Sequence, residues 1–221
     1  MSDGHTYIEQ VAEKGAAAVI VEKDVEAPEG LTVIKVKDTR YALAMTSAAY
    51  FGYPAEKLKV IGITGTKGKT TTTYMVKSIL EEVGIRVGLI GTIEAIIGDK
   101  SIPANNTTPE SYTIQKYFAE MVEAGCECVV MEVSSQGLKL DRTAGIPFEI
   151  GSLRTLAKIT SDRTNTKTLT SISIARACCL NRARSESAMW MINGSKTFSK
   201  MRHAKLRHSD FLIKQISVPQ M

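Results

Sequence analysis

The strongest constraint on the fold of this chain is one stretch, "VIGITGTKGKTTTTYM", at Val60–Met75. An apolar, β-branched run leads into a loop of glycine, threonine and lysine, and a helical pattern follows. This is the strand–loop–helix order of a phosphate-binding loop. Gly65 and Gly68 let the backbone turn tightly and bring N–H groups against phosphate oxygens. The glycine that the common Walker pattern requires is replaced by Ile63, so the stretch predicts a nucleotide site with an unusual glycine spacing.

Two side chains of this loop suit nucleotide chemistry. Lys69 can neutralise charge on the β- and γ-phosphates, and the Thr70 hydroxyl can bind Mg²⁺. The helix that begins near Lys69 adds the positive end of its dipole. The alternative is a glycine-rich turn capped by threonine, which needs no ligand. The strand before the loop and the amphipathic helix after it favour the nucleotide site.

Strand and helix patterns alternate through the first 151 residues. This alternation is typical of an α/β fold with a parallel sheet flanked by helices. We expect neighbouring strands at "KVIGIT", "RVGLIG" and "CECVVMEV", and helices from the loop to Gly84 and over "SYTIQKYFAEMVEAG". The predicted domains are a small α/β N-terminal domain at 1–57 and a P-loop-type central domain for nucleotide binding at 58–151.

The N-terminal segment has its own pattern. A helix that ends at Gly15, a short buried strand at "AAAVIVE" and a second strand at "LTVIKV" are expected before Asp38. Asp38 is a plausible N-cap for the helix "TRYALAMTSAAYF". That helix is apolar on nearly every side, so we expect it to be well packed.

Composition changes abruptly near residue 151. Residues 152–221 hold 13 of the 28 lysines and arginines but only 3 of the 23 acidic residues, and 15 of the 16 glycines precede them. Such a break marks a domain boundary or a tail of different origin. One interpretation is a basic, nucleic-acid-binding tail on a nucleotide-binding domain, although its aromatic residues for stacking are few.

The remaining bulk features indicate a cytoplasmic protein. The four cysteines (Cys126, Cys128, Cys178 and Cys179) have neither metal-ligand spacing nor the pattern of a disulfide framework, which favours a reducing compartment. No apolar run approaches the roughly 18 residues of a membrane span, and the N-terminus lacks the order of a secretory signal.

Two further motifs lie downstream of the loop. In "VVMEVSSQGL" a buried strand ends at Glu132, where a second Mg²⁺ ligand is expected beside the loop of an α/β sheet. The alternative is an acid that faces solvent. The segment "NNTTPES" has two interpretations. In one its threonines contact a ligand, and in the other Thr108 is the N-cap and Pro109 the first residue of a helix.

Taken together, three segments resemble the Mur ligases: "GTKGKTT" (Gly65–Thr71), "NTTPE" (Asn106–Glu110) and "EVSSQGLKLDR" (Glu132–Arg142). They most resemble the members that add the third amino acid, commonly diaminopimelate or lysine, to UDP-N-acetylmuramoyl-L-alanyl-D-glutamate in peptidoglycan synthesis. The glycine spacing is that family's own variant, and the acid–Val–Ser–Ser block separates these members from the folylpolyglutamate synthases. The resemblance covers residues 1–151. Gln136 stands where many members have histidine.

The resemblance implies a reaction and a set of site residues. ATP converts the D-Glu carboxylate to an acyl phosphate, which the incoming amine attacks. Lys69 and Glu132 would be catalytic, and Thr70 and Glu132 would bind Mg²⁺. The partners would be the UDP-N-acetylmuramoyl dipeptide and an amino acid. The chain would be monomeric and would bind neither a membrane nor nucleic acid. The implied ATP contacts are Gly65, Thr66, Lys67, Gly68, Lys69, Thr70 and Thr71, and the implied contacts to the UDP-linked substrate are Thr107, Thr108, Ser134 and Arg142.

The resemblance stops after Gly151. The codons beyond it, read one nucleotide earlier, permit "TNLSKDH" and a lysine in "YCKS", which match motifs that the family carries next. This predicts a single-nucleotide deletion just after the Gly151 codon, with residues 152–221 out of frame and without a consistent core. The chain also begins late in the family's N-terminal domain. We therefore expect ATP binding at most and no ligase activity. A generic P-loop kinase or GTPase is a rival, but its base-reading motifs are missing.

Overall fold

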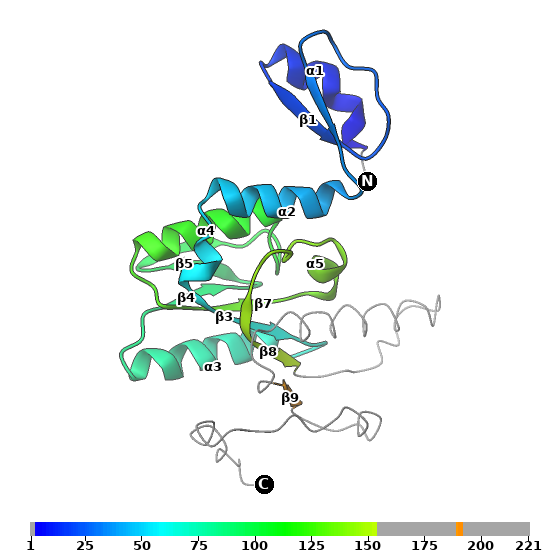
Figure 1. Ribbon diagram of the computed structural model, residues 1–221. Helices are drawn as coiled ribbons and strands as arrows, with labels where there is room; N and C mark the ends of the chain where they lie inside the picture. The colour runs from blue at the N-terminus through cyan, green and yellow to red at the C-terminus, as the bar shows by residue number, and fades with distance from the viewer. Residues whose placement is uncertain (1–2, 154–188, 192–221) are drawn as a thin grey trace, which may run out of the picture.

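The computed structural model describes residues 3–153 and 189–191, and a seven-stranded sheet lies at its centre (Figure 1). The strand order is β6-β5-β4-β7-β3-β8-β9. The strands are β3 (Lys59–Thr64), β4 (Val87–Ile90), β5 (Glu94–Ile97), β6 (Lys100–Pro103), β7 (Cys128–Glu132), β8 (Phe148–Leu153) and β9 (Met189–Met191). The three strands expected to be parallel neighbours are β4, β7 and β3, and this prediction is confirmed.

One edge of the sheet differs from the expected parallel pattern. β5 pairs antiparallel with both β4 and β6, and β5 and β6 form a hairpin whose turn contains Gly98 at φ 56°. A two-residue turn of this kind requires a positive φ, which glycine adopts without strain. The sheet is therefore mixed, with a parallel centre and an antiparallel edge.

Helices cover both faces of the sheet and bury separate cores. On one face α3 (Lys69–Glu82) packs through Val76 and Leu80 against Ile63, Val87 and Val130. On the other face lie α4 (Ser111–Glu123) and the short α5 (Ser135–Lys139), and the larger core there is built from buried residues of η2, β3, β7, α4 and α5. The chain runs from β3 to β4 in one direction across the sheet and from β7 to β8 in the opposite direction. Since crossovers between parallel strands are right-handed, the helices of these two connections lie on opposite faces.

The N-terminal residues form a smaller unit. A short helix pair, η1 (Gly4–Tyr7) and α1 (Ile8–Glu13), precedes the parallel pair β1 (Ala18–Val21) and β2 (Thr32–Lys35). α2 (Thr39–Tyr50) and η2 (Pro54–Lys57) then lead into β3. The Asp38 side chain accepts hydrogen bonds from the backbone N–H groups of Arg40 and Tyr41, so the expected N-cap is confirmed.

Two packing expectations for this unit are wrong. Of β1 only Val21 is buried, and β2 is exposed along its length. α2 leaves Tyr41, Leu43 and Tyr50 exposed by 49%, 43% and 76%. α2 packs mainly against α4 through a narrow stripe of small residues, so its other apolar side chains stay exposed. Along the described ranges 3–153 and 189–191, no helix is both long and apolar enough to cross a membrane.

The segment after residue 151 is described only in part. Residues 152–153 end β8, which the residue pattern did not assign as a strand, and β9 pairs parallel with β8. The rest of this segment, including Cys178 and Cys179, lies outside the described residues. The expectation that the tail lacks a consistent core concerns those residues and stays a prediction. Cys126 and Cys128 are buried free thiols, and burial raises the pKa of Cys128 to about 11.

Candidate nucleotide site

The loop after β3 has the geometry that its glycines predict. Gly65 and Gly68 adopt φ values of 150° and 79°, which favour glycine, and Gly68 is the N-cap of the 14-residue helix α3. The backbone N–H groups of the first turn of α3 therefore open onto the carboxyl end of the sheet. Oriented N–H groups and a helix dipole at one place favour an anion such as phosphate.

The side chains of the loop are held close to its backbone. Lys69 Nζ donates a hydrogen bond of 3.1 Å to the Gly65 carbonyl, so the ammonium group lies over the loop. The hydroxyl groups of Thr72 and Thr73 donate to the carbonyls of Gly68 and Thr70 at 2.7 Å each. These bonds stabilise the first turn of α3.

Glu132 lies beside this loop at the end of β7. The register pairs Glu132 with Ile63, two residues before Gly65. Its side chain follows Cys128 and Val130 on the face of the sheet that α3 covers, and it is fully buried. Buried acids need compensating partners. Both carboxylate oxygens of Glu132 find them in Thr92, whose backbone N–H donates to Oε1 at 2.9 Å and whose hydroxyl donates to Oε2 at 3.1 Å.

Thr92 was not among the residues expected from the sequence. It follows Gly91 at the carboxyl end of β4, and β4 is the strand next to β7. Since the carboxyl ends of neighbouring parallel strands lie at one edge of a sheet, the "GT" after "RVGLI" was the available signal. A Cβ on Gly91 would lie 2.7 Å from Glu132 Oε1, so glycine leaves the space that this oxygen fills.

The residues expected to contact the UDP-linked substrate have different surroundings. Thr108 is 1% exposed, and its hydroxyl donates to the Glu132 carbonyl at 3.0 Å and accepts from the Ser134 N–H at 2.9 Å. The Ser134 hydroxyl oxygen caps α5 by accepting from the Gly137 N–H. The interpretation of Thr108 as the N-cap of the next helix is wrong, because the N-cap of α4 is Glu110. These two side chains brace the backbone around Glu132.

Arg142 also supports this loop. Its Nη1 donates to the Thr108 carbonyl at 3.0 Å, and its Nη2 forms an ion pair with Glu110. Its Nε is buried and has no hydrogen-bond partner among the residues that the structure describes. Thr107 is the fourth residue expected to contact the substrate. Its hydroxyl lies 3.0 Å from the hydroxyl of Thr92, at the carboxyl end of β4.

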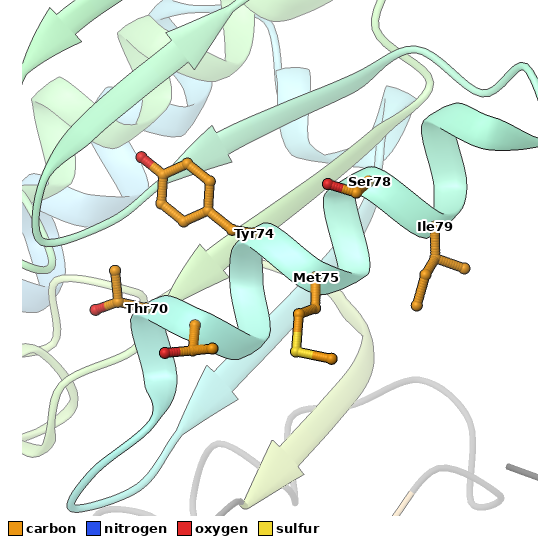
Figure 2. A pocket seen from close by; sticks show the side chains of 6 residues that line it. Thr70, Tyr74, Met75, Ser78 and Ile79 are labelled. Carbon is orange, nitrogen blue, oxygen red and sulfur yellow. The ribbon is translucent and has the colours of Figure 1, made fainter.

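A groove of about 520 Å³ runs along α3 beside the loop, and Figure 2 shows the side chains that line it. Thr70 lies at the loop end of this groove, while Met75 and Ile79 are 59% and 54% exposed. Its lining residues are Thr70, Thr71, Tyr74, Met75, Ser78 and Ile79.

Tyr74 links α3 to the β5–β6 hairpin. Its hydroxyl donates to Glu94 at 2.5 Å, and the same carboxylate accepts from Ser101. Burial, the hydrogen bond to Glu94 and the charges of Glu94 and Glu132 raise the pKa of Tyr74 to about 12. The hydrogen bonds from Ser101 and Tyr74 lower the pKa of Glu94.

Sequence comparison assigns these residues to a family. The Mur ligase middle domain matches residues 63–211, which is more than half of the chain. The chain belongs to the Mur ligase family. It is 54% identical over 156 residues to the UDP-N-acetylmuramoyl-L-alanyl-D-glutamate--2,6-diaminopimelate ligase of Clostridium perfringens, and 47% identical over 156 residues to that of Bacillus licheniformis. Each alignment covers 71% of this chain and 32% of the relative, so this Mur ligase chain spans about a third of the length of these curated relatives.

Solved structures agree on the fold. A UDP-N-acetylmuramoyl-L-alanyl-D-glutamate--2,6-diaminopimelate ligase structure superposes with a TM-score of 0.65 at 24% identity, covering 81% of this chain and 36% of that one. A Mycobacterium tuberculosis folylpolyglutamate synthase complexed with ADP and AMPPCP has a TM-score of 0.53 at 17% identity, covering 68% and 41%. The expected α/β fold with a P-loop-type domain is confirmed.

Proposed function

We propose that this chain binds MgATP at Gly65–Thr71 as part of a ligase that adds the third amino acid to UDP-N-acetylmuramoyl-L-alanyl-D-glutamate in peptidoglycan synthesis. The observation that carries the proposal is the loop itself, with Lys69 lying over it and the buried Glu132 beside it. The names of relatives that are 45–54% identical support the substrate class. A cytoplasmic location and a monomeric chain belong to the same proposal.

The donor groups of the site fit Mg²⁺. The Thr70 hydroxyl and the Glu132 carboxylate are hard oxygen ligands of the kind that Mg²⁺ prefers. Among the described residues, the Glu132 carboxylate accepts hydrogen bonds from Thr92 alone, so a cation is a chemically reasonable further partner for this buried group. When bound, Mg²⁺ would neutralise charge on the phosphoryl group that is transferred.

The loop residues would then act on the nucleotide. The N–H groups from Gly65 to Thr71 would hold phosphate oxygens, and Lys69 would exchange the Gly65 carbonyl for a phosphate oxygen. Such a charge-assisted bond is stronger than the one it replaces. Stabilising charge on the transferring group is how phosphoryl transfer is catalysed. The activated D-Glu carboxylate would then be attacked by the incoming amine.

The residues near the substrate divide into two roles. Thr107 would contact the UDP-linked dipeptide through its hydroxyl. Thr108, Ser134 and Arg142 would hold the loop that carries it, since their polar groups bind backbone or Glu110.

We also propose that residues 152–221 are translated out of frame after a single-nucleotide deletion behind the Gly151 codon. The curated relatives align over about 156 of the 221 residues, close to the number that precede the proposed deletion, and this length supports the proposal. The family match extends to residue 211 and so includes most of this segment. Protein comparison therefore does not test the proposed deletion, and the test must be made on the gene. Sequencing the DNA around codon 151 decides it, and an intact frame there would remove the proposal.

The first prediction tests the nucleotide site through Lys69→Ala. Removing the ammonium group eliminates a hydrogen bond between charged groups, so we expect ATP affinity to fall by roughly 1.5–3 kcal/mol, or more than tenfold. Isothermal titration with MgATP measures it. Lys116→Ala is the matched control, because it removes the same charge from an exposed position on α4. Equal affinities of wild type and Lys69→Ala would exclude Lys69 from the site.

A further inference from the structure

The Thr92 hydroxyl lies between two groups of the site. Thr92 Oγ1 is 3.1 Å from Glu132 Oε2 and 3.0 Å from Thr107 Oγ1. Thr92 itself is exposed, whereas Glu132 is fully buried. The Thr92 hydroxyl therefore belongs to an exposed residue and bonds directly to the buried carboxylate.

A count of protons restricts how this hydroxyl can bond. A threonine hydroxyl has one proton to donate, and a carboxylate oxygen only accepts. When Thr92 donates to Glu132, the bond between the two threonines must be donated by Thr107. When Glu132 Oε2 has another partner, Thr92 can donate to Thr107 instead. The Thr107 proton then becomes available to a third group.

We propose that Thr92 is a positioning residue that competes with a cation for Glu132 Oε2 and couples the cation site to ligand binding at Thr107. This inference rests on the proposed function and assigns a role to a residue outside the predicted site. With a cation held by the Glu132 carboxylate, the Thr92 hydroxyl would turn to Thr107, and the Thr107 hydroxyl would be able to donate to an acceptor oxygen of the UDP-linked dipeptide. Coupling of this kind is reciprocal, so the ligand also favours the cation.

The hydroxyl is not required to place the carboxylate. The backbone N–H of Thr92 holds Oε1 at 2.9 Å whatever the side chain, and the missing Cβ of Gly91 leaves room for that oxygen. Replacing the hydroxyl by a methyl group therefore keeps Glu132 in place and removes only the competitor. A purely structural role predicts the opposite result, a loss of cation affinity.

The first measurement uses Mn²⁺ alone as the probe, with bound and free metal separated by electron paramagnetic resonance of the full chain. We expect Thr92→Val to bind Mn²⁺ about fivefold more tightly than wild type, at the low end of typical coupling between sites. Thr92→Ser keeps the hydroxyl and should match wild type. Thr46→Val is the control, since it removes a hydroxyl that binds only backbone on α2. Unchanged or weaker Mn²⁺ binding by Thr92→Val, or no Mn²⁺ binding by either protein, would overturn the proposal.

Since the 221-residue chain is expected to bind ATP at most, the second measurement repeats the titration on the protein with one nucleotide restored behind the Gly151 codon and the preceding segment supplied, in the presence of saturating UDP-N-acetylmuramoyl-L-alanyl-D-glutamate. In wild type and Thr92→Ser the dipeptide should tighten Mn²⁺ binding about fivefold or more. In Thr92→Val this gain should fall by several fold, and a retained gain would contradict the coupling. If the dipeptide does not bind wild type, the proposed substrate fails, while the Mn²⁺ titration alone still decides whether Thr92 competes for Glu132.

Discussion

At the scale of single residues, the site depends on how one buried acid is satisfied. Glu132 is fully buried and its two oxygens receive hydrogen bonds from one residue, Thr92. Its own carbonyl accepts from Thr108, so side chain and backbone are both fixed. The backbone N–H at Oε1 keeps the carboxylate oriented, so only the Thr92 hydroxyl at Oε2 has to turn away when a cation binds.

Gly91→Ala tests this arrangement. The new Cβ would lie 2.7 Å from Glu132 Oε1, closer than van der Waals contact allows, so the carboxylate must move. We expect the affinity for MgATP to fall roughly tenfold or more, the usual effect of disturbing the groups that orient a metal ligand. Titration calorimetry with and without Mg²⁺ measures it. Gly4→Ala is the control, because no atom lies within 4 Å of the Cβ that it adds. Retention of full affinity by Gly91→Ala would mean that Glu132 does not bind the metal.

At the scale of elements, the sequence indicated the nucleotide loop and the central strands because their signals are local. β-branched runs, loop glycines and a 3.6-residue apolar period identify β3, β4, β7, α3 and α4 without reference to the rest of the chain. The β5–β6 hairpin and β8 were missed. Their patterns are short, and pairing at the edge of the sheet decides their structure. The contact between Thr92 and Glu132 joins residues 40 positions apart, so it depends on strand order, which periodicity alone does not give.

The hairpin is joined to α3 by the Tyr74–Glu94–Ser101 cluster, which gives a pH-dependent prediction. The fold raises the pKa of Tyr74 to about 12 from an ordinary value of 10.0. The stability contributed by the neutral phenol is therefore complete below pH 10 and is lost as pH rises through about 12. For Glu94 the pKa is lowered, so its contribution is present above its ordinary value of 4.5 and is lost as pH falls below it.

Tyrosinate absorbance measures this directly. Among the seven tyrosines we expect one late step near pH 12 that is absent from Tyr74→Phe and moves to lower pH in Glu94→Gln. Tyr41→Phe, which alters an exposed tyrosine of α2, should leave the late step unchanged. A late step that survives Tyr74→Phe would assign the raised pKa to another tyrosine.

At the scale of the whole molecule, two thin helical layers enclose a sheet whose carboxyl edge carries every candidate site residue. The loop after β3, Thr92 after β4 and Glu132 at the end of β7 come from three neighbouring strands. The relatives are roughly twice as long as this chain, and the aligned residues cover 32% of their length. Binding of nucleotide can be argued from the described residues alone, whereas the complete ligase reaction also requires groups that the family carries beyond the region of resemblance.

The last prediction concerns catalysis by the whole chain. Ligase activity requires an activated carboxylate and an amine held in line, and such positioning can supply roughly 7–11 kcal/mol of barrier reduction. With residues 152–221 out of frame, the "TNLSKDH" motif and the lysine that the family carries after Gly151 would be missing. We expect no tripeptide product, by mass spectrometry, from the 221-residue chain with ATP, Mg²⁺, UDP-N-acetylmuramoyl-L-alanyl-D-glutamate and either diaminopimelate or lysine.

Restoring one nucleotide behind the Gly151 codon, with the downstream gene and the preceding segment supplied, should restore turnover, and Lys69→Ala in the repaired protein should abolish it. Product from the unrepaired chain would contradict the assignment of residues 152–221 as a shifted frame that disables the enzyme.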